Sequence, residues 1–534
     1  MKPYLSYVFF SISILILTNC AKTGRPEGGP KDEEAPLFVI ANPPYETTNF
    51  NKKEIELDFN EFIKLKDLNK QLFVSPPLKT PLLVSPQATA TKTLSLKIVD
   101  TLIKNTTYII NFGNAVEDNN EGNQLENFKY VFSTGTYIDS LTTSGEIKNA
   151  FVNESPKNIN VLLYKIDSSF NDSIVYKKKP NYITNTLDTS FFNFSNLKEG
   201  KYLMLALKEK SNDYIFNSKE DKIGFYLDTI TLPKDSITKK PIILFKEIQP
   251  FKFKRAKEIA KGKIQFGYEG EAVDLKIKLI SKKPDNFKSI SKFEIDKDTL
   301  NYWFTPIETD SLNFIVTNKN NIDTVTVKLR KKKTDSLMLK SSAGSILNLR
   351  DTLFIIGNNP PVKIDESKIM LLDKDTLKVS YSSYISKKEN KIGILFDKKQ
   401  KQKYALKILP SAIFDIFGQK NDSLNFNFTT KEIEDYGKIT INIVNSQNKN
   451  LIVELLNDKS EFIERKFTNT SKGIVFNLLE PKSYKIRVIV DKNKNNKWDT
   501  GNYLQKKTPE KIKYLSETLN LKANWDLIEQ LVIE

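Results

Sequence analysis

The 534-residue sequence contains no histidine and a single cysteine, Cys20. Catalytic sites built on a histidine base are therefore excluded, and so are zinc and iron sites with histidine ligands. One cysteine cannot form an internal disulfide, and in an exported chain a free thiol would be a liability. The GxSxG, phosphate-loop and dinucleotide motifs are absent as well. These absences argue against most familiar enzyme classes.

Long apolar runs are absent except at the N-terminus. The segment MKPYLSYVFFSISILILTNC has one lysine and then an apolar run over residues 4–17, which is too short to span a bilayer as a mature helix. Its end, L-T-N-C, resembles a bacterial lipobox, although Asn19 replaces the usual glycine, alanine or serine. The resemblance implies a signal peptide of residues 1–19, cleavage before Cys20 and lipid on the Cys20 sulfur. The alternative is an ordinary secretory signal beside a chance cysteine.

Long helical periodicity is missing too, and segment 254–263, KRAKEIAKGK, has at best the spacing of a short helix. Segments such as KEIELDF, TLSLKIV, KYLMLAL and YKIRVIV alternate apolar and polar residues or are rich in β-branched residues, and they lie between Asn, Asp, Gly and Pro clusters. Many short strands with frequent turns predict an all-β protein made of β-sandwiches. After removal of residues 1–19, the remaining 515 residues (534 − 19) suffice for about four or five domains.

One element of the sequence is repeated without a gap at an offset of 296 residues. YIINFGNAVEDNNEGNQLENFKYVFST begins at Tyr108, and YALKILPSAIFDIFGQKNDSLNFNFTT begins at Tyr404. Both contain a tyrosine strand, an Asp/Gly loop and a strand that ends in Phe-x-Thr. This pattern resembles the bacterial SbsA-type immunoglobulin-like (Ig-like) domain. The resemblance implies one such domain at 36–137 and a second, divergent one at 341–432, whose first strand lacks the D-F-N-E-F part.

A second element is repeated after each Ig-like copy. NLKEGKYLMLALKEKSNDYIF begins at Asn196, and NLLEPKSYKIRVIVDKNKNNKWD begins at Asn477. Each contains Asn-Leu, a turn, a tyrosine-bearing strand and a polar loop closed by an aromatic residue. The pattern resembles the transthyretin-like (carboxypeptidase-regulatory-like) sandwich and implies such domains at 138–250 and 433–534. Residues 251–340 are expected to form a middle β region, and the sequence leaves open whether it is a further sandwich. The expected architecture is an extended array of tandem sandwiches.

The segment that follows Cys20 is rich in glycine, proline and charge, and residues 20–35 therefore predict a flexible tether. Its pattern, C-x-x-x-G-R-P-x-G-G-P-K-D, resembles the start of Bacteroidota lipoproteins with SbsA-type Ig-like domains. The resemblance implies a lipid-anchored outer-membrane protein and carries no known activity. Because AKTGR directly after Cys20 is basic, the sequence does not decide between the periplasmic and the surface side.

The loop VIVDKNKNNKWDTGNY, residues 488–503, has the spacing of a calcium loop. Side-chain oxygens recur at Asp491, Asn493, Asn495 and Asp499, and the Lys497 carbonyl could add another oxygen. Ca²⁺ binds six to eight such oxygens, which alternate residues of a curved loop can supply. Asn502 stands where a bidentate carboxylate is expected, and three lysines add positive charge. The alternative is a polar turn in which Asn and Asp side chains bond to their own backbone.

The tripeptide Asp-(Ser/Thr)-apolar occurs repeatedly and resembles the O-glycosylation signal of Bacteroidota, in which the hydroxyl carries the glycan. The alternative is structural, because Asp-Ser and Asp-Thr also close turns before strands. The candidate acceptors are Thr101, Ser140, Thr299, Ser336 and Thr376.

Lysine and arginine exceed aspartate and glutamate by 82 to 65, which gives a formal net charge of +17. In an exported protein this excess favours anionic glycans or lipopolysaccharide over nucleic acid as partners. The sequence thus predicts a non-enzymatic, lipid-anchored envelope protein that acts as a scaffold, spacer or binding module. Its expected partners are the membrane, through the lipid, and envelope proteins or anionic glycans. The alternatives are a glycan- or lipopolysaccharide-binding surface protein and an envelope hydrolase that uses two carboxylates.

Overall fold

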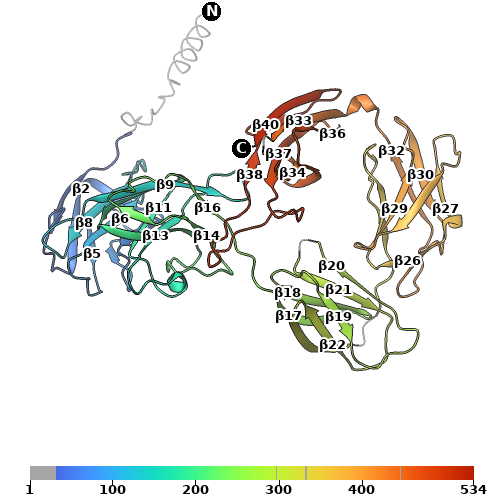
Figure 1. The fold of residues 1–534 in the computed structure, drawn as a ribbon, viewed down its shortest axis with the longest axis horizontal. Helices are drawn as coiled ribbons and strands as arrows, with labels where there is room; N and C mark the ends of the chain where they lie inside the picture. Colours follow the sequence, from blue (N-terminus) through green and yellow to red (C-terminus); the bar gives the residue numbers. More distant parts are fainter. Residues whose placement is uncertain (1–31, 296, 331–332, 446, 534) are drawn as a thin grey trace, which may run out of the picture.

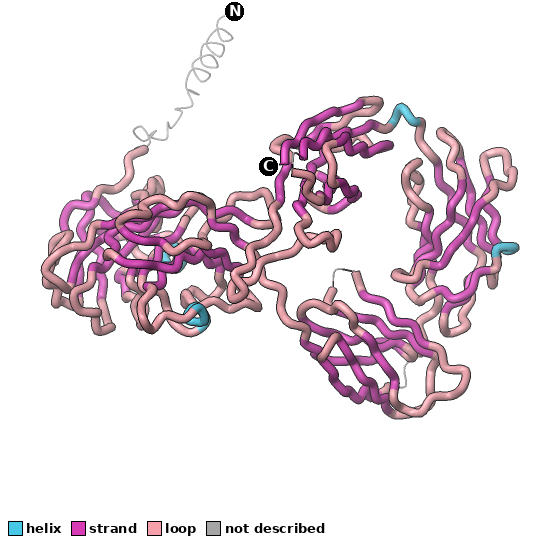
Figure 2. Tube along the Cα trace, in the orientation of Figure 1, coloured by secondary structure: helices cyan, strands magenta, loops and turns pink. Residues whose placement is uncertain are grey.

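The computed structural model describes residues 32–295, 297–330, 333–445 and 447–533. Cys20 and the predicted signal peptide lie outside these residues. Strands dominate the described residues, which confirms the all-β fold class (Figures 1 and 2). The described helical segments are short: α2 (Leu68–Gln71), η1 (Asp172–Tyr176), η2 (Glu366–Lys368) and η3 (Ile433–Asp435).

The first sandwich packs two sheets around an aromatic-rich core. One sheet has the order β1-β2-β5-β4 with β7 beside β2, and the other has the order β3-β6-β8. Ile55, Leu57 and Phe59 alternate with polar residues along β2 and point into the core. The strands are β1 (Phe38–Asn42), β2 (Glu54–Leu65), β3 (Phe73–Ser75), β4 (Leu83–Ser85), β5 (Thr91–Lys97), β6 (Thr107–Gly113), β7 (Val116–Asp118) and β8 (Phe128–Ser133).

The fourth sandwich contains the other copy of the gapless sequence repeat. Its sheets have the orders β24-β25-β29-β28, β27-β30-β32 and β26-β31. The strands are β24 (Leu339–Ser341), β25 (Leu353–Gly357), β26 (Pro361–Ile364), β27 (Ile369–Leu372), β28 (Tyr381–Ile385), β29 (Lys391–Phe396), β30 (Lys403–Ile408), β31 (Ile413–Asp415) and β32 (Leu424–Thr429).

The repeated tyrosine makes the same contacts in both copies. The Tyr108 hydroxyl accepts a hydrogen bond from the Ile103 amide at 2.9 Å, and the Tyr404 hydroxyl accepts one from the Lys399 amide at 2.9 Å. Each ring also stacks on the phenylalanine of the Phe-x-Thr strand, at 5.4 Å and 5.6 Å respectively. A tyrosine that bonds back to the upstream backbone is a recurrent corner of Ig-like sandwiches.

The second sandwich consists of the sheets β11-β10-β13-β14, with β15 beside β13, and β12-β9-β16. Its β16 runs parallel to β9, whereas its other strand pairs are antiparallel. The strands are β9 (Leu141–Asn149), β10 (Asn160–Lys165), β11 (Tyr182–Asn185), β12 (Phe191–Leu197), β13 (Gly200–Lys208), β14 (Lys222–Phe225), β15 (Ile230–Leu232) and β16 (Ile242–Leu244).

The fifth sandwich repeats this topology strand for strand. Its sheets have the orders β35-β34-β37-β38, with β39 beside β37, and β36-β33-β40, in which β40 runs parallel to β33. The strands are β33 (Gly437–Asn445), β34 (Leu451–Asn457), β35 (Phe462–Thr468), β36 (Lys472–Leu479), β37 (Ser483–Val490), β38 (Ile512–Tyr514), β39 (Leu519–Asn520) and β40 (Asp526–Ile533). The second and fifth sandwiches therefore share one fold, as their repeated sequence element predicts.

The third sandwich lies between the second and the fourth along the chain, and its first strand contradicts one expectation from the sequence. Segment 254–263, which has at best the spacing of a short helix, lies mostly in the strand β17, where pairing with β18 outweighs its helical propensity. The sheets have the orders β17-β18-β21-β20 and β19-β22-β23. The strands are β17 (Lys252–Ala260), β18 (Lys263–Glu269), β19 (Lys276–Leu279), β20 (Ser289–Phe293), β21 (Thr299–Phe304), β22 (Ser311–Asn318) and β23 (Asn321–Lys328).

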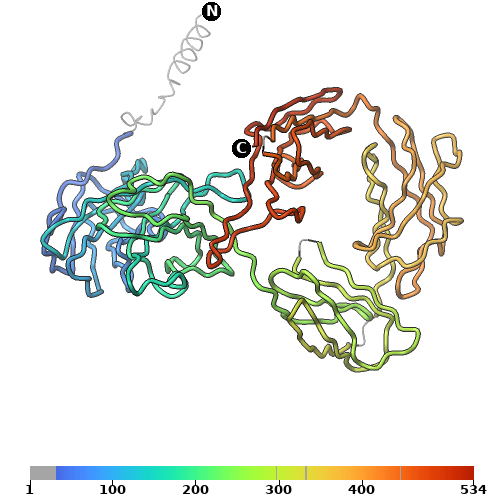
Figure 3. Tube along the Cα trace, in the orientation of Figure 1, coloured from blue at the N-terminus to red at the C-terminus, as the bar shows by residue number. Residues whose placement is uncertain are grey.

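The array of sandwiches bends back on itself. The first two sandwiches lie side by side, and the third, fourth and fifth form an arc that returns to the second (Figures 1 and 3). The return contact is made mainly by the segment between β37 and β38, residues 491–511, which we call the C-terminal loop, with help from Arg487 and Tyr514 on those strands. The chain therefore closes a ring of four sandwiches, with the first sandwich attached outside it.

Candidate functional site

The C-terminal loop begins with a turn that Asp491 organises. Its buried carboxylate accepts hydrogen bonds from the backbone amides of Asn495 at 3.2 Å and Asn496 at 2.9 Å. Lys494 and Asn496 have φ values of 61° and 62°, a left-handed conformation that asparagine adopts more readily than most residues. This half of the loop is the polar turn expected from its composition.

The predicted calcium residues do come together in this turn. Asp499 Oδ2 accepts hydrogen bonds from the side-chain amides of Asn493 and Asn495, the latter at 3.0 Å. The Lys497 side chain points away and forms an ion pair with Glu271 of the third sandwich at 2.7 Å. Among the described residues, no group of three His, Cys, Asp or Glu side chains is placed to hold a metal ion.

Calcium binding therefore stays a prediction, since the amides that face Asp499 must turn their oxygens inward before they can act as ligands. Calorimetry of the full chain with millimolar Ca²⁺ tests it. Heat that disappears in the Asp491→Asn variant would establish the metal site. No heat would leave the loop held by its own hydrogen bonds.

The second half of the loop leaves its own sandwich and inserts Tyr503 into the second one. Tyr503 is 0% exposed. Its ring meets Phe225 edge to face at 5.6 Å and lies 6.4 Å from Tyr176. Buried aromatic side chains are frequent among the residues that contribute most to such interfaces.

Polar contacts surround the buried ring. The Tyr503 amide donates to Glu247 Oε1 at 2.6 Å, and the Thr500 hydroxyl donates to the Lys246 carbonyl at 2.7 Å. Lys506 forms an ion pair with Asp172 at 2.5 Å. Burial raises the pKa of Glu247, and the hydrogen bond from Tyr503 partly offsets that rise.

A second contact joins the same two sandwiches beside the first. Phe151 of the second sandwich packs on Trp498 at 4.8 Å and lies under the Arg487 guanidinium at 4.2 Å. The Tyr514 hydroxyl donates to the Phe151 carbonyl. A cation over an aromatic face is stabilised by the negative potential of the ring. The joint therefore combines the buried Tyr503 with a neighbouring stack of Phe151 on Trp498 and Arg487.

The sequence of β13 explains why the C-terminal loop covers the outer face of the second sandwich. Its residues 202–207, YLMLAL, are all buried. Tyr202, Met204 and Ala206 face the core between the two sheets, whereas Leu203, Leu205 and Leu207 belong to a second apolar cluster on the outer face, which also contains Tyr503. A strand that is apolar on both faces predicts a covering element on each.

We expect Gly501→Ala to weaken the joint by about 1–3 kcal/mol, the usual cost of overpacking. A Cβ at this position would lie 2.6 Å from both the Lys507 carbonyl oxygen and the Phe245 ring. Gly344→Ala is the matched control, because a Cβ there would meet no atom within 4 Å. Hydrogen exchange of the Tyr503 amide measures the difference. Equal protection in both variants would contradict the close packing at Gly501.

The second sandwich has an equivalent loop, residues 209–221, between β13 and β14. Glu209 takes the place of Asp491: its carboxylate accepts from the backbone amides of Asp213 and Tyr214, both at 3.0 Å. The two acids thus bind the amides four and five residues further along the chain. This loop folds without the alternate oxygen spacing, in agreement with a purely structural turn.

Glu209 should make the second sandwich less stable at alkaline pH. Burial, with help from the charge of Asp213, raises its pKa to about 7, above the ordinary 4.5 of an unfolded chain. The stability that the protonated group provides is therefore complete below about pH 4.5 and is lost as the pH rises through 7. Thermal melts across this range should show the loss, and Glu209→Gln should flatten it while Glu220→Gln should not. An unchanged slope in Glu209→Gln would assign the pH dependence to other groups.

The predicted glycosylation acceptors have different surroundings. Four of them are exposed, whereas Thr299 is half-buried as the first residue of β21. Exposure is required for modification but does not establish it, so these sites stay predictions, as does lipidation of Cys20. The exposed acceptors are Thr101, Ser140, Ser336 and Thr376.

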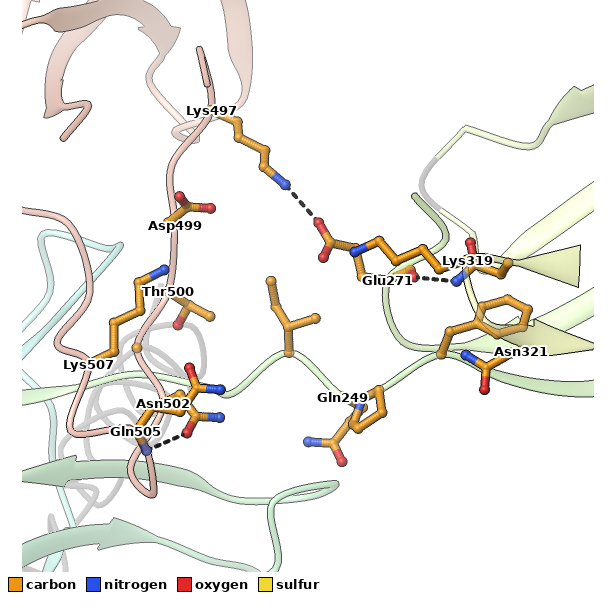
Figure 4. A pocket seen from close by; sticks show the side chains of 15 residues that line it. Gln249, Glu271, Lys319, Asn321, Lys497, Asp499, Thr500, Asn502, Gln505 and Lys507 are labelled. Carbon is orange, nitrogen blue, oxygen red and sulfur yellow. Dashed lines mark hydrogen bonds and ion pairs between the residues drawn. The ribbon is translucent and has the colours of Figure 1, made fainter. Parts of the chain in front are cut away.

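A polar cavity of about 410 Å³ opens where the C-terminal loop, the linker after β16 and the third sandwich meet (Figure 4). Two carboxylates line it, and both already have partners. Glu271 pairs with Lys497, and Asp499 binds the amides of Asn493 and Asn495. The contacts of Lys497, Asn493 and Asn495 therefore hold both carboxylates in place.

The fold and the joint together define a tandem β-sandwich protein whose array is closed by an interdomain loop. The family model described as a bacterial Ig-like domain matches residues 32–134, which covers the first sandwich. No curated protein matches the chain. Within the described residues, no helix has the length and apolarity required to cross a membrane.

Several solved structures match parts of the chain at low identity and low TM-score. Domains 1–6 of the surface layer protein SbsC are 10% identical over 92% of this chain and 68% of that chain, with a TM-score of 0.15. BcpA, the major pilin subunit of Bacillus cereus, is 10% identical over 74% and 99%, with a TM-score of 0.14. Domains from titin are 13% identical over 46% and 93%, with a TM-score of 0.14. At these TM-scores the likenesses support no conclusion about function.

Proposed function

We propose that this chain is a non-enzymatic, lipid-anchored scaffold of the bacterial outer membrane. The observation that carries the proposal is the joint between the second and fifth sandwiches. Tyr503 is buried in the apolar cluster on the outer face of the second sandwich, so a contact specific to this arrangement holds the ring of four sandwiches in one shape. A protein that sets distances between other molecules needs a defined shape, whereas a flexible string of domains would not supply one.

Further details belong to the same proposal. The lipobox-like sequence supports attachment through Cys20, and the segment after it supports an origin in Bacteroidota. The shared topology of the second and fifth sandwiches supports their transthyretin-like type. We likewise propose domain boundaries after residues 137, 250, 340 and 432. Envelope proteins are the proposed partners.

Two experiments test separate parts of this proposal. Metabolic labelling with radioactive palmitate should mark the wild-type chain and leave Cys20→Ser unmarked. Equal labelling of both would overturn the anchor.

Crosslinked co-purification from the native outer membrane should recover a specific partner with the wild type and lose it with the joint variant Tyr503→Ala. Recovery of no partner, or the same recovery with both chains, would overturn the scaffold role while leaving the anchor untouched.

A further inference from the structure

A second cavity, of about 660 Å³, lies between the first and second sandwiches and is strongly basic. Pocket volumes of roughly 300–1,000 Å³ are typical of sites for small organic ligands. Prolines and the exposed side chain of Ile103 supply the uncharged part of its wall. No carboxylate belongs to its lining. The lysines that line it are Lys79, Lys165, Lys177, Lys178, Lys179 and Lys198.

Local structure brings these lysines together. The turn after η1 is fixed by the amides of Lys177 and Lys178, which both donate to the Ile174 carbonyl at 2.9 Å. This turn carries three successive lysines to the mouth of the cavity. Lys165, at the end of β10, is fixed next to them because its amide donates to Asn181 Oδ1 at 2.7 Å. Backbone hydrogen bonds thus fix the positions from which these lysine side chains extend.

Two of the ammonium groups bind across the junction. Lys179 Nζ donates to the Leu78 carbonyl at 2.7 Å, and Lys198 Nζ donates to the Asn105 carbonyl. Both acceptors belong to the first sandwich, so these lysines tie the two sandwiches together around the cavity. Neutral carbonyl acceptors leave the positive charge of each lysine uncancelled.

The other four lysines have neither an ion pair nor a side-chain hydrogen bond to any residue that the structure describes. Asp100 and Asp167 lie near the lysines and Asp139 lies near the lining Tyr182 and Tyr202, but none of the three lines the cavity. Asp167 accepts hydrogen bonds from Ser169, and together with the field of Lys165 and Lys178 these lower its pKa. Asp100 accepts from the Thr80 amide at 2.8 Å. The cavity therefore carries a large excess of positive charge, which focuses an attractive potential for anions.

We propose that this cavity binds a compact polyanion, and that the occupant is a small oligosaccharide bearing phosphate or carboxylate groups. Lysine ammonium groups bind phosphate and carboxylate as point charges. A nucleotide is disfavoured, because base stacking needs an open aromatic face. The lining rings, Tyr182 and Tyr202, are buried and packed against each other at 5.9 Å. The choice of a glycan rests on the envelope location proposed above, whereas the preference for a polyanion does not.

Titration calorimetry of the full chain tests the proposal with tetragalacturonate, a tetrasaccharide with four carboxylates, as the charged probe and maltotetraose as the uncharged one. The charged probe should bind, bind more weakly as salt is added, and lose at least about tenfold in affinity in the double variant Lys177→Glu/Lys178→Glu. Both positions are exposed, so the fold should be unaffected. Lys387→Glu/Lys388→Glu is the matched control, since it makes the same charge change at exposed lysines of the fourth sandwich.

Three results would overturn the proposal. Equal loss in both double variants would reduce binding to an effect of net charge. Binding of maltotetraose as tight as that of the charged probe would remove the anion requirement. Variant-sensitive binding to phosphatidylglycerol vesicles without binding of the tetrasaccharide would make the cavity a membrane contact. None of these measurements depends on Cys20, so failure of the glycan site is distinguishable from failure of the anchor.

Discussion

Replacing Tyr503 by alanine should open the ring of four sandwiches and leave all five sandwiches folded. The side chain is fully buried against Phe225 and Tyr176, although it belongs to another sandwich. Truncating a buried aromatic side chain to alanine costs about 3–5 kcal/mol. Because the second and fifth sandwiches keep their own cores, this cost falls on the joint between them. The joint then dissociates before either sandwich unfolds.

Small-angle scattering should show this opening as an increase in the radius of gyration and in the maximum dimension. Tyr503→Phe is the control, because it keeps the buried ring and loses only the hydroxyl contact with Asp172, at 3.3 Å. It should stay as compact as the wild type. An alanine variant with unchanged dimensions would show that the remaining contacts hold the ring without Tyr503.

Replacing Glu454 by alanine should destabilise the fifth sandwich by about 3–5 kcal/mol, the usual cost of leaving a buried charge without its partner. The Glu454 side chain is 1% exposed and lies between Arg465 and Arg487 on the two neighbouring strands. Its two carboxylate oxygens bind one guanidinium each, with Nε to oxygen distances of 2.9 and 2.7 Å. Without the carboxylate, the buried Arg487 keeps its charge and loses its counter-ion.

Chemical denaturation of the full chain in a Trp303→Phe background, followed by the fluorescence of Trp498 and Trp525 in the fifth sandwich, measures this loss. Asp526→Ala is the control in the same sandwich, because it breaks an exposed ion pair with Lys438. Exposed pairs contribute at most about 1 kcal/mol. Similar losses in the two variants would mean that the buried carboxylate is no more important than a surface one.

The repeated tyrosine shows what could be predicted from the sequence. The offset of 296 residues between Tyr108 and Tyr404 also relates Ile103 to Lys399, the residues whose amides bond to the two hydroxyls. Such contacts span only a few residues, so a gapless repeat preserves them. The same holds for the loop that Asp491 organises, because its hydrogen bonds reach only the next turn of chain.

The joint was not predictable in this way. Trp498 and Tyr503 are apolar residues in a polar loop, and this was the available signal that the loop meets another surface. Apolar residues on both faces of β13 required a cover but did not say which segment provides it. The partners Tyr503 and Glu247 are 256 residues apart, and their pairing depends on the angles between four sandwiches. No local pattern encodes those angles.

Closure of the ring also determines how the molecule carries mechanical load. A pull between the N-terminal sandwich and the C-terminus passes from the second sandwich to the fifth through the C-terminal loop (Figure 3). The third and fourth sandwiches carry none of this force while the C-terminal loop stays bound to the second sandwich. Release of the whole joint, Tyr503 together with the contacts of Phe151, would bring them into the line of force and lengthen the protein without unfolding any core.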